Sequence, residues 1–305
     1  MDKTEIILAF GKLREIEKHS ETSTAQYKVR AYTNAINDLK AFPNKLVKLE
    51  DVPKLGMGDK LKSKVNEMIA TGKISQLEQL MKKKKPKAIL TFPNILGFGP
   101  KFVNELFSRK IYTLTQLQKS RIKLTDTQLI GIKYNKDLSR LIPRSVVKPS
   151  IFKITGFDVM LCGSYRRGKE KMGDLDVLVI PDKLVPTSYT KNISAYLVVL
   201  VKKLKVPYVL VSRGPTKIII LLKLDKYYRH VDIRFIEPKS KIPAMIYFTG
   251  SKEFNIKMRS TAKKLGYKLN EYSLTNLKTG KTVKLKTEKG LFKKLNMTYL
   301  RPKDR

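Results

Sequence analysis

A short stretch near the middle of the chain decides the expected fold and chemistry. Residues 162–168 are Cys-Gly-Ser-Tyr-Arg-Arg-Gly, and residues 173–180 are Gly-Asp-Leu-Asp-Val-Leu-Val-Ile. Asp174 and Asp176 are two positions apart, so their side chains lie on one face of a strand. Apolar residues continue that face along the segment. The pattern predicts a largely apolar strand that carries two carboxylates at one end.

A third carboxylate has a similar setting. Asp232 alternates with apolar neighbours in the segment 231–235. Buried carboxylates repel one another and lose hydration, so such a group needs a cation between its members. Three carboxylates on adjacent strands can hold two hard divalent ions, typically Mg²⁺, with Mn²⁺ as a substitute. The simpler alternative for an Asp-x-Asp pair is a solvated strand end.

The glycine-rich turn before the acidic pair is typical of an anion site. Gly163 makes backbone N–H groups accessible, and Ser164 and a following arginine add donors that could hold a triphosphate. Gly-Ser alone is a common loop dipeptide. Its combination with the acidic pair places an anion site next to a cation site, as phosphoryl transfer requires.

The apolar periodicity changes once along the chain. Helical spacing dominates the first half, and short segments rich in Val, Ile and Leu begin after Pro149. We therefore expect an α+β fold. Its expected parts are a helical domain at 1–81, a basic linker at 82–90, a helical subdomain at 91–145, a mixed β-sheet at 146–237 and a small α+β subdomain at 238–305. The expected strands of the sheet are 158–162, 174–180, 208–212, 217–224 and 231–236, with one helix at 192–204.

The linker follows from a run of lysines at 82–87 that contains Pro86. Like charges repel, and proline disfavours helix in the residue before it. A nuclear import signal is the functional alternative. We favour an interdomain linker that lies near DNA.

Composition indicates the kind of partner. The 305 residues include 64 Lys+Arg and 26 Asp+Glu, a formal net charge of +38, and every expected part has an excess of basic residues. This charge favours a polyanion, either nucleic acid or an anionic membrane surface, and its spread favours extended contact with a phosphate backbone. One cysteine, Cys162, excludes an intrachain disulfide, and two histidines make a structural zinc site unexpected. Without a signal peptide or a long apolar run, we expect a soluble intracellular protein.

Two glycine hairpins resemble helix-hairpin-helix elements. One contains Gly56 and Gly58, and the other contains Gly97 and Gly99. Glycine lets a backbone come close to DNA, and the N–H groups of a following helix can bind phosphate without reading sequence. A plain turn between helices is the alternative. The high positive charge favours DNA.

These motifs are similar to those of the family X DNA polymerases, in the nucleotidyltransferase superfamily. The resemblance covers essentially the whole chain and is strongest at 162–168, 173–177, 247–251, 254–255, 258–259 and 270–272. It implies that 1–81 is a 5′-deoxyribose phosphate lyase-like domain and that 91–145 is a DNA-binding subdomain. The sheet at 146–237 would be the catalytic palm, and 238–305 would bind the nascent base pair.

The resemblance also implies roles for individual residues. Asp174 and Asp176 would bind both metal ions, and Asp232 would complete the catalytic metal site and assist deprotonation of the primer 3′-hydroxyl. The nucleotide would be bound by Arg144, Gly163, Ser164, Arg167, Gly173, Tyr247, Phe248, Gly250 and Asn255. DNA would be bound by Lys28, Tyr32, Gly56, Gly58, Lys60, Gly97, Gly99, Arg234, Arg259 and Tyr272. Without the resemblance, these would be ordinary core aromatic and surface polar residues.

A lysine at 64 would carry the lyase chemistry. Schiff-base formation needs a neutral amine, and the match over 56–65 assigns this nucleophile to Lys64. Lys28, Tyr32 and Lys60 would bind the 5′-phosphate side. The alternative for Lys64 is a solvated helix lysine.

Three positions depart from the family pattern. Ser63 replaces a glutamate that usually precedes the lyase lysine, which weakens the lyase inference because a nearby acid could assist proton transfer. His230 replaces an arginine two residues before the third aspartate, and Tyr27 replaces a histidine of the lyase pocket. These changes point to altered efficiency or fidelity.

We therefore expect a template-directed polymerase that fills short gaps in base excision repair. Its partners would be gapped or nicked double-stranded DNA and deoxynucleoside triphosphates, without a membrane, and the chain would be a monomer. One rival is a non-catalytic basic DNA-binding protein. The other is a template-independent terminal transferase, which the absence of an extra loop between Pro207 and Lys223 disfavours. The expected location is the nucleus, or a virion or cytoplasmic viral factory if the source is a large DNA virus.

Overall fold

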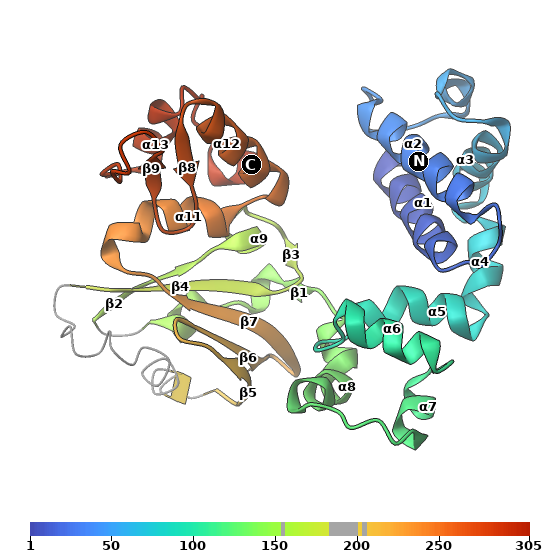
Figure 1. Cartoon of the computed structure of the whole chain (residues 1–305), viewed down its shortest axis with the longest axis horizontal. Coiled ribbons are helices and arrows are strands. Elements are labelled where there is room, and N and C mark those ends of the chain that lie inside the picture. The colour runs from blue at the N-terminus through green and yellow to red at the C-terminus, as the bar shows by residue number, and fades with distance from the viewer. Residues whose placement is uncertain (154–155, 183–200, 203–205) are drawn as a thin grey trace. The chain divides into compact units, whose positions relative to one another are not determined.

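The computed structural model describes residues 1–153, 156–182, 201–202 and 206–305. The chain divides into two compact units, Met1–Ile132 and Lys133–Arg305, each of which is described by itself below (Figure 1). The helix expected at 192–204 lies largely outside the described residues. Among the described residues, no helix combines the length and the apolar character that crossing a bilayer would require.

The first unit is built from helices around two apolar clusters. One cluster gathers Ile6, Phe10 and Leu13 with Leu39 and Val65, and the second lies around Phe92, Phe98 and Leu106. The helices are α1 (Lys3–Lys18), α2 (Ala25–Ala41), α3 (Asp59–Thr71), α4 (Ser75–Met81), α5 (Lys84–Thr91), α6 (Pro100–Ser108), α7 (Leu114–Lys119) and α8 (Asp126–Leu138), the last of which contains the division between the units. These elements confirm the helical first half of the expected α+β fold.

The segment expected as a linker contains a helix. α5 begins at Lys84 and has Pro86 in its first turn, where a missing backbone N–H leaves no hydrogen bond unmade. Ala88 and Ile89 are buried, one in each apolar cluster of the unit. Burial of these two residues outweighs the repulsion among the lysines, so most of the segment predicted as a basic linker is helical.

The second unit contains the mixed sheet. Its five strands are β2 (Phe157–Leu161), β4 (Leu175–Pro181), β5 (Tyr208–Arg213), β6 (Lys217–Leu224) and β7 (Tyr227–Phe235), in the order β2-β4-β7-β6-β5. The β4–β7 pair is parallel and the other pairs are antiparallel. Each expected strand is present, although β7 begins four residues before its expected start. A two-stranded pair, β1 (Ile142–Pro143) and β3 (Lys171–Met172), and the one-turn helix α9 (Gly163–Arg166) belong to the same unit.

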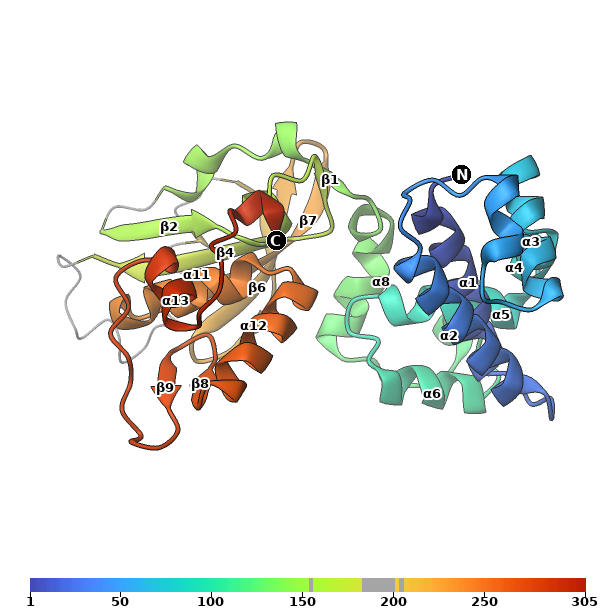
Figure 2. The same cartoon turned by 90° about the horizontal axis from the view of Figure 1, so that it is seen from above.

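The two faces of β4 have different neighbours. Val177 and Val179 join the larger core of the unit, whereas Leu178 and Ile180 pack with Cys162 and Ala244 on the opposite face. Ala244 belongs to α11 (Lys241–Thr249), which therefore covers the face that also carries Asp176 (Figure 2). The remaining elements, α12 (Lys252–Lys264), β8 (Tyr267–Leu269), β9 (Leu274–Asn276) and α13 (Glu288–Lys294), enclose a third core around Met258 and Phe292.

Candidate active site

Parallel pairing of β4 and β7 brings two carboxylates side by side. Asp176 and Asp232 are register partners, so their side chains emerge from neighbouring strands on the same face of the sheet. Asp174 immediately precedes β4 and is exposed. Burial raises the pKa of Asp176 to about 7, and the nearby carboxylates of Asp174 and Asp232 contribute to the increase. The three predicted metal ligands thus act on one another electrostatically.

A lysine that the sequence pattern did not reveal lies in this acidic cluster. Lys217 Nζ is 2.5 Å from Oδ2 of Asp232, while Oδ1 of Asp232 is buried and has no hydrogen-bond partner among the described residues. The signal was present only in strand pairing: β6 and β7 run antiparallel, with Lys217 opposite Arg234 and Ile219 opposite Asp232. Without that register, a lysine 15 positions before Asp232 is one among many in this chain.

His230, which replaces the family arginine, lies half-buried two positions before Asp232. Burial lowers the pKa of His230, against the opposite effect of Asp174 and Asp232. The imidazole is therefore biased toward its neutral form. The close positive charge near these carboxylates therefore comes from Lys217 and not from His230.

The glycine turn is fitted to the acidic pair. Gly163 has a φ of 53°, and a Cβ placed on it would lie 2.0 Å from Oδ2 of Asp176. Only glycine therefore allows the start of α9 to lie this close to the carboxylate. Ser164 follows in α9 and is half-buried, and Gly173 is exposed with open space around its α-carbon.

Two arginines of the predicted phosphate site are held by backbone oxygens. Arg144 donates from Nη1 to the carbonyl oxygen of Tyr165 at 2.7 Å and stacks over the Tyr165 ring. Arg167 donates from Nη1 to the carbonyl oxygen of Thr249 at 2.5 Å. A Cβ on Gly250 would lie 3.0 Å from the same nitrogen, so Gly250 and Arg167 are neighbours. Both guanidinium groups are thus tethered around α9.

The carboxylates of this cluster are chemically suited to bind a divalent cation. Carboxylate oxygens are the preferred ligands of hard cations, and an unpartnered buried oxygen on Asp232 would gain most from one. The described residues nevertheless contain no group of three or more His, Cys, Asp and Glu side chains that is already arranged around an ion position. Lys217 instead neutralises one oxygen of Asp232.

The predicted sugar and base residues gather on α11 and α12. Asn255 donates from Nδ2 to the carbonyl oxygen of Tyr247 at 2.7 Å, and the Tyr247 and Phe248 rings are in edge-to-face contact. Tyr247, Asn255 and Arg259 line one narrow hollow together with Asn270. Arg234 lies over the Phe248 ring at 5.6 Å. Tyr272 is 47% exposed outside this group.

A second site lies in the first unit. A hollow of about 560 Å³ is lined by Lys28, Tyr32, Gly58, Lys60 and Lys64. Five residues predicted for the lyase site or its DNA contacts therefore share one surface. Tyr27, at the position of the family histidine, is 77% exposed and also lines it.

The residues of this second site differ in how deeply they are buried. Tyr32 is only 5% exposed and packs edge-on against Phe10, and burial raises its pKa to about 12. Lys28 forms an ion pair of 3.3 Å with the buried Glu17. Tyr32 is therefore part of the core as well as of the hollow, whereas Lys64 is less constrained.

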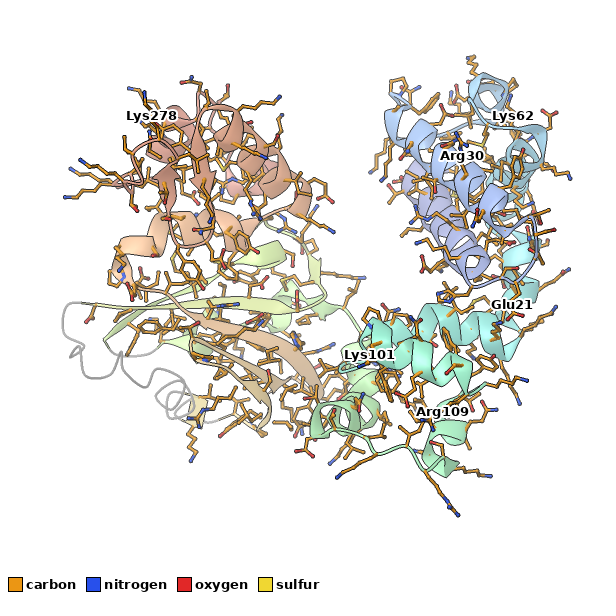
Figure 3. The ribbon with its side chains drawn as sticks, viewed as in Figure 1. Glu21, Arg30, Lys62, Lys101, Arg109 and Lys278 are labelled. Carbon is orange, nitrogen blue, oxygen red and sulfur yellow. The ribbon has the colours of Figure 1, made fainter. Side chains whose placement is uncertain are left out.

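The two glycine hairpins share one arrangement. Gly58 and Gly99 are the N-caps of α3 and α6, and a Cβ placed on either would meet no atom within 4 Å, which leaves their backbones accessible. Gly56 and Gly97 instead face the protein, toward Asp38 and the backbone of Gln128 respectively. The second glycine of each pair thus fits a phosphate contact, and the first serves packing. Basic side chains such as Lys62, Lys101, Arg109 and Lys278 extend from many elements (Figure 3).

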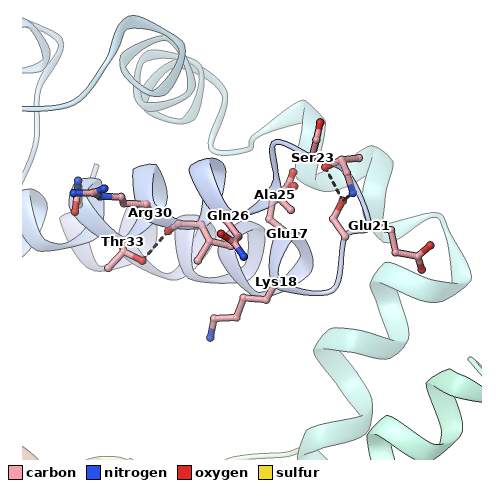
Figure 4. A pocket seen from close by; sticks show the side chains of 12 residues that line it. Glu17, Lys18, Glu21, Ser23, Ala25, Gln26, Arg30 and Thr33 are labelled. Atoms are coloured by element: carbon pink, nitrogen blue, oxygen red, sulfur yellow. Dashed lines mark hydrogen bonds between the residues drawn. The ribbon is translucent and has the colours of Figure 1, made fainter.

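A larger hollow contains none of the predicted residues. It measures about 820 Å³ and lies along the end of α1 and the start of α2, where Glu17, Glu21 and Arg30 contribute to its walls (Figure 4). It is open, and its walls carry Lys18 and Arg30 as well as the two carboxylates, so it lacks the excess of positive charge that would favour a DNA phosphate.

Known protein families match most of the chain. Four family models match successive parts of it: a helix-hairpin-helix domain at 1–74, the fingers domain of DNA polymerase lambda at 90–139, the DNA polymerase beta palm at 143–238 and the DNA polymerase beta thumb at 244–305. The chain is 27% identical to DNA polymerase lambda of Arabidopsis thaliana over 97% of this chain and 60% of the relative. It is 27% identical to DNA polymerase lambda of Rattus norvegicus over 96% of this chain and 55% of the relative. It is 25% identical to the DNA polymerase type-X family protein pol4 of Schizosaccharomyces pombe over 93% of this chain and 61% of the relative. The chain thus spans 55–61% of the length of these relatives.

Proposed function

The chain belongs to the X family of DNA polymerases, and we propose that it is a template-directed DNA polymerase that fills short gaps in base excision repair. The observation that carries the proposal is the register of Asp176 with Asp232 beside the Gly163 turn. A cation site and an anion site would lie next to each other there, which is the arrangement that nucleotidyl transfer needs.

The residues of this site would divide the work of the reaction. Asp174, Asp176 and Asp232 would hold two divalent ions, Mg²⁺ or in its place Mn²⁺. Bound there, the ions would favour ionisation of the primer 3′-hydroxyl and stabilise the leaving phosphate oxygen. Asp232, with its unpartnered buried oxygen, would accept the hydroxyl proton or orient the hydroxyl.

The nucleotide would be held from two sides. Backbone N–H groups at Gly163 and the Ser164 hydroxyl would bind the phosphates, together with Arg144 and Arg167 once they leave their carbonyl partners. On the other side, Tyr247 and Phe248 would line the sugar pocket. Asn255 would then face the minor-groove edge of the incoming base, and Arg259 would face the template strand.

We also propose a 5′-deoxyribose phosphate lyase activity for the first unit. Lys64 shares the 560 Å³ hollow with Lys28 and Lys60, whose charges would bind the 5′-phosphate, and the amine of Lys64 would form the Schiff base. Ser63 is exposed and offers no acid at the family position. This departure predicts slower proton transfer in the lyase step.

DNA would be bound through phosphate contacts in both units. Gly58 and Gly99 would each present a helix N-terminus to a strand of gapped or nicked DNA, and deoxynucleoside triphosphates would be the second substrate. The enzyme would act as a monomer in the nucleus. The turn between β5 and β6 is short, with Gly214 donating to the carbonyl oxygen of Lys217, which weighs against a template-independent transferase.

The test is Mg²⁺-dependent incorporation of one deoxynucleotide into a one-nucleotide gap. Asp232→Ala should abolish nucleotide addition and leave binding of the gapped DNA nearly intact. Asp225→Asn, at the exposed turn between β6 and β7, is the matched control and should extend normally. Equal extension by Asp232→Ala and the unmodified protein would exclude the proposed role of Asp232. Absence of extension by the unmodified protein would favour a non-catalytic DNA-binding protein.

A further inference from the structure

The ammonium group of Lys217 lies inside the acidic cluster. Its Nζ is 2.5 Å from Oδ2 of Asp232, and the two side chains are 32% and 17% exposed. Its charge also lowers the pKa of Asp176 and, more weakly than burial does, that of His230. Within the part of the chain that the structure describes, Lys217 is therefore the cation that forms an ion pair with Asp232.

Strand pairing explains how Lys217 reaches Asp232. Lys217 is directly opposite Arg234 on β7, and Asp232 is opposite Ile219. Directly opposed residues share a face of the sheet, so these four side chains lie on the face that carries the acidic pair. Lys217 then contacts Asp232 along the diagonal, and its long stem spans that distance.

We propose that Lys217 is a positioning residue that acts as an internal counter-ion for Asp232 and competes with a divalent cation for its carboxylate. The inference rests on the proposed role of Asp232 as a metal ligand. An ammonium at hydrogen-bond distance from Oδ2 occupies the space that an ion on that oxygen would need, and two cations at such separation repel strongly. Binding of an ion through Oδ2 therefore requires Lys217 to leave.

The surroundings allow Lys217 to leave. A third of the side chain is exposed, and the flexible four-carbon stem can carry the ammonium into solvent. Without Lys217, the largely buried carboxylate of Asp232 would lose the cation that it contacts. Lys217 thus makes the free protein less dependent on an ion, and it weakens the affinity of the site for that ion.

The experiment measures Mn²⁺ affinity in the full chain without DNA or nucleotide, by the electron paramagnetic resonance signal of free Mn²⁺. Lys217→Met should bind Mn²⁺ roughly 2- to 5-fold more tightly than the unmodified protein, the factor expected when a partly shielded ion pair is removed. Lys217→Gln should behave alike, which covers the case in which one variant does not fold. Lys217→Arg keeps the charge and should bind no more tightly than the unmodified protein.

Lys223→Met is the matched control. Lys223 lies on the same strand and is exposed. Its replacement by Met changes the net charge by the same amount, so this variant should have nearly the same affinity for Mn²⁺ as the unmodified protein. A second readout is thermal unfolding: Lys217→Met should be stabilised by Mn²⁺ more than the unmodified protein is. If Lys217 served only to hold Asp232 in place, Lys217→Met would bind Mn²⁺ more weakly than the unmodified protein does.

Two outcomes separate this inference from the proposed function. If the unmodified protein binds Mn²⁺ through Asp232, as loss of affinity in Asp232→Asn would show, and both neutral Lys217 variants bind it no more tightly, then Lys217 does not compete. If neither the unmodified protein nor any Lys217 variant binds Mn²⁺ more tightly than Asp232→Asn does, the metal role of Asp232 itself is wrong.

Discussion

A Cβ atom placed on Gly163 would lie 2.0 Å from Oδ2 of Asp176, far inside the contact distance of any carbon and oxygen. The same glycine has a φ of 53°, in the left-handed region that side chains disfavour. Asp176 is held in place by β4, where it pairs with Asp232. The glycine turn and the acidic strand are therefore mutually fitted, and neither can be altered alone.

Gly163→Ala should disable nucleotide addition. The new methyl group must displace Asp176 or the start of α9, and a displacement of about 1 Å in such a site can reduce the rate about 100-fold. Single-turnover filling of a one-nucleotide gap measures this effect. Gly168→Ala is the control, because Gly168 also has a positive φ, 75°, but open space around it. A Gly163→Ala enzyme no slower than Gly168→Ala would contradict the argument.

Asp176 should make the metal-free protein lose stability as the pH rises. Its pKa is raised to about 7 in the folded state, from 3.8, mainly by burial and then by the other carboxylates. The folded state therefore holds a proton that the unfolded state has released between these values. The stability associated with this proton is complete below about pH 4 and is lost as the pH rises through about 7. The loss is on the order of 4 kcal/mol.

Urea unfolding in the presence of a chelator, at pH values from 4 to 8, measures this loss. Asp176→Asn should flatten this part of the profile and should be more stable than the unmodified protein at pH 8. Asp158→Asn, a half-exposed carboxylate on β2 paired with Lys241, serves as the control and should keep the slope. An unchanged slope in Asp176→Asn would assign the pH dependence to another group.

The sheet and its acidic face were predictable from the sequence because alternation with a period of two is local information. Leu178 and Ile180 continue the face of Asp176, as that period requires, and pack against α11. The neighbour of each strand is not local information. Lys217 reaches Asp232 because β6 pairs with β7 in one particular register, which the two-residue turn at Asp225 and Lys226 sets, eight positions or more from Lys217.

The segment at 82–90 shows that packing can also override a strong local signal in the sequence. Its lysines and Pro86 are strong local signals for a break, yet α5 begins at Lys84. Burial of Ala88 and Ile89 in two apolar clusters decides the outcome, and the cluster that contains Ile89 forms from residues far away in the chain, such as Ile6 and Leu39. In the hollow around Lys64, the resemblance to a family identified the members, but the burial of Tyr32 required the structure.

Arg305 should be essential for the stability of the small subdomain. Its side chain is fully buried, bonds the Glu288 carboxylate at 3.0 Å and 3.3 Å and lies over the rings of Phe254, Phe292 and Tyr299. Glu288 also binds Arg166 of α9, so the carboxylate joins this subdomain to the glycine turn. Removing one partner of a buried ion pair costs about 3–5 kcal/mol.

Chemical unfolding should therefore show Arg305→Ala destabilised by about 3 kcal/mol. Arg301→Ala is the matched control, because Arg301 is largely exposed and its pair with Asp304 lies at the surface. Its effect should stay within about 0.5 kcal/mol. Similar stability of the two variants would mean that Arg166 alone satisfies Glu288.

Lys64→Ala should separate the two proposed activities. The amine of Lys64 would form the Schiff base, so this variant should lose borohydride trapping on DNA with a 5′-deoxyribose phosphate end. Gap filling should persist, because Asp174, Asp176 and Asp232 belong to the second unit.

Lys62→Ala is the control: Lys62 lies on the same helix but bonds the carbonyl oxygen of Pro53 and does not line the hollow. Trapping that persists in Lys64→Ala and disappears in Lys60→Ala or Lys28→Ala would move the nucleophile to that lysine.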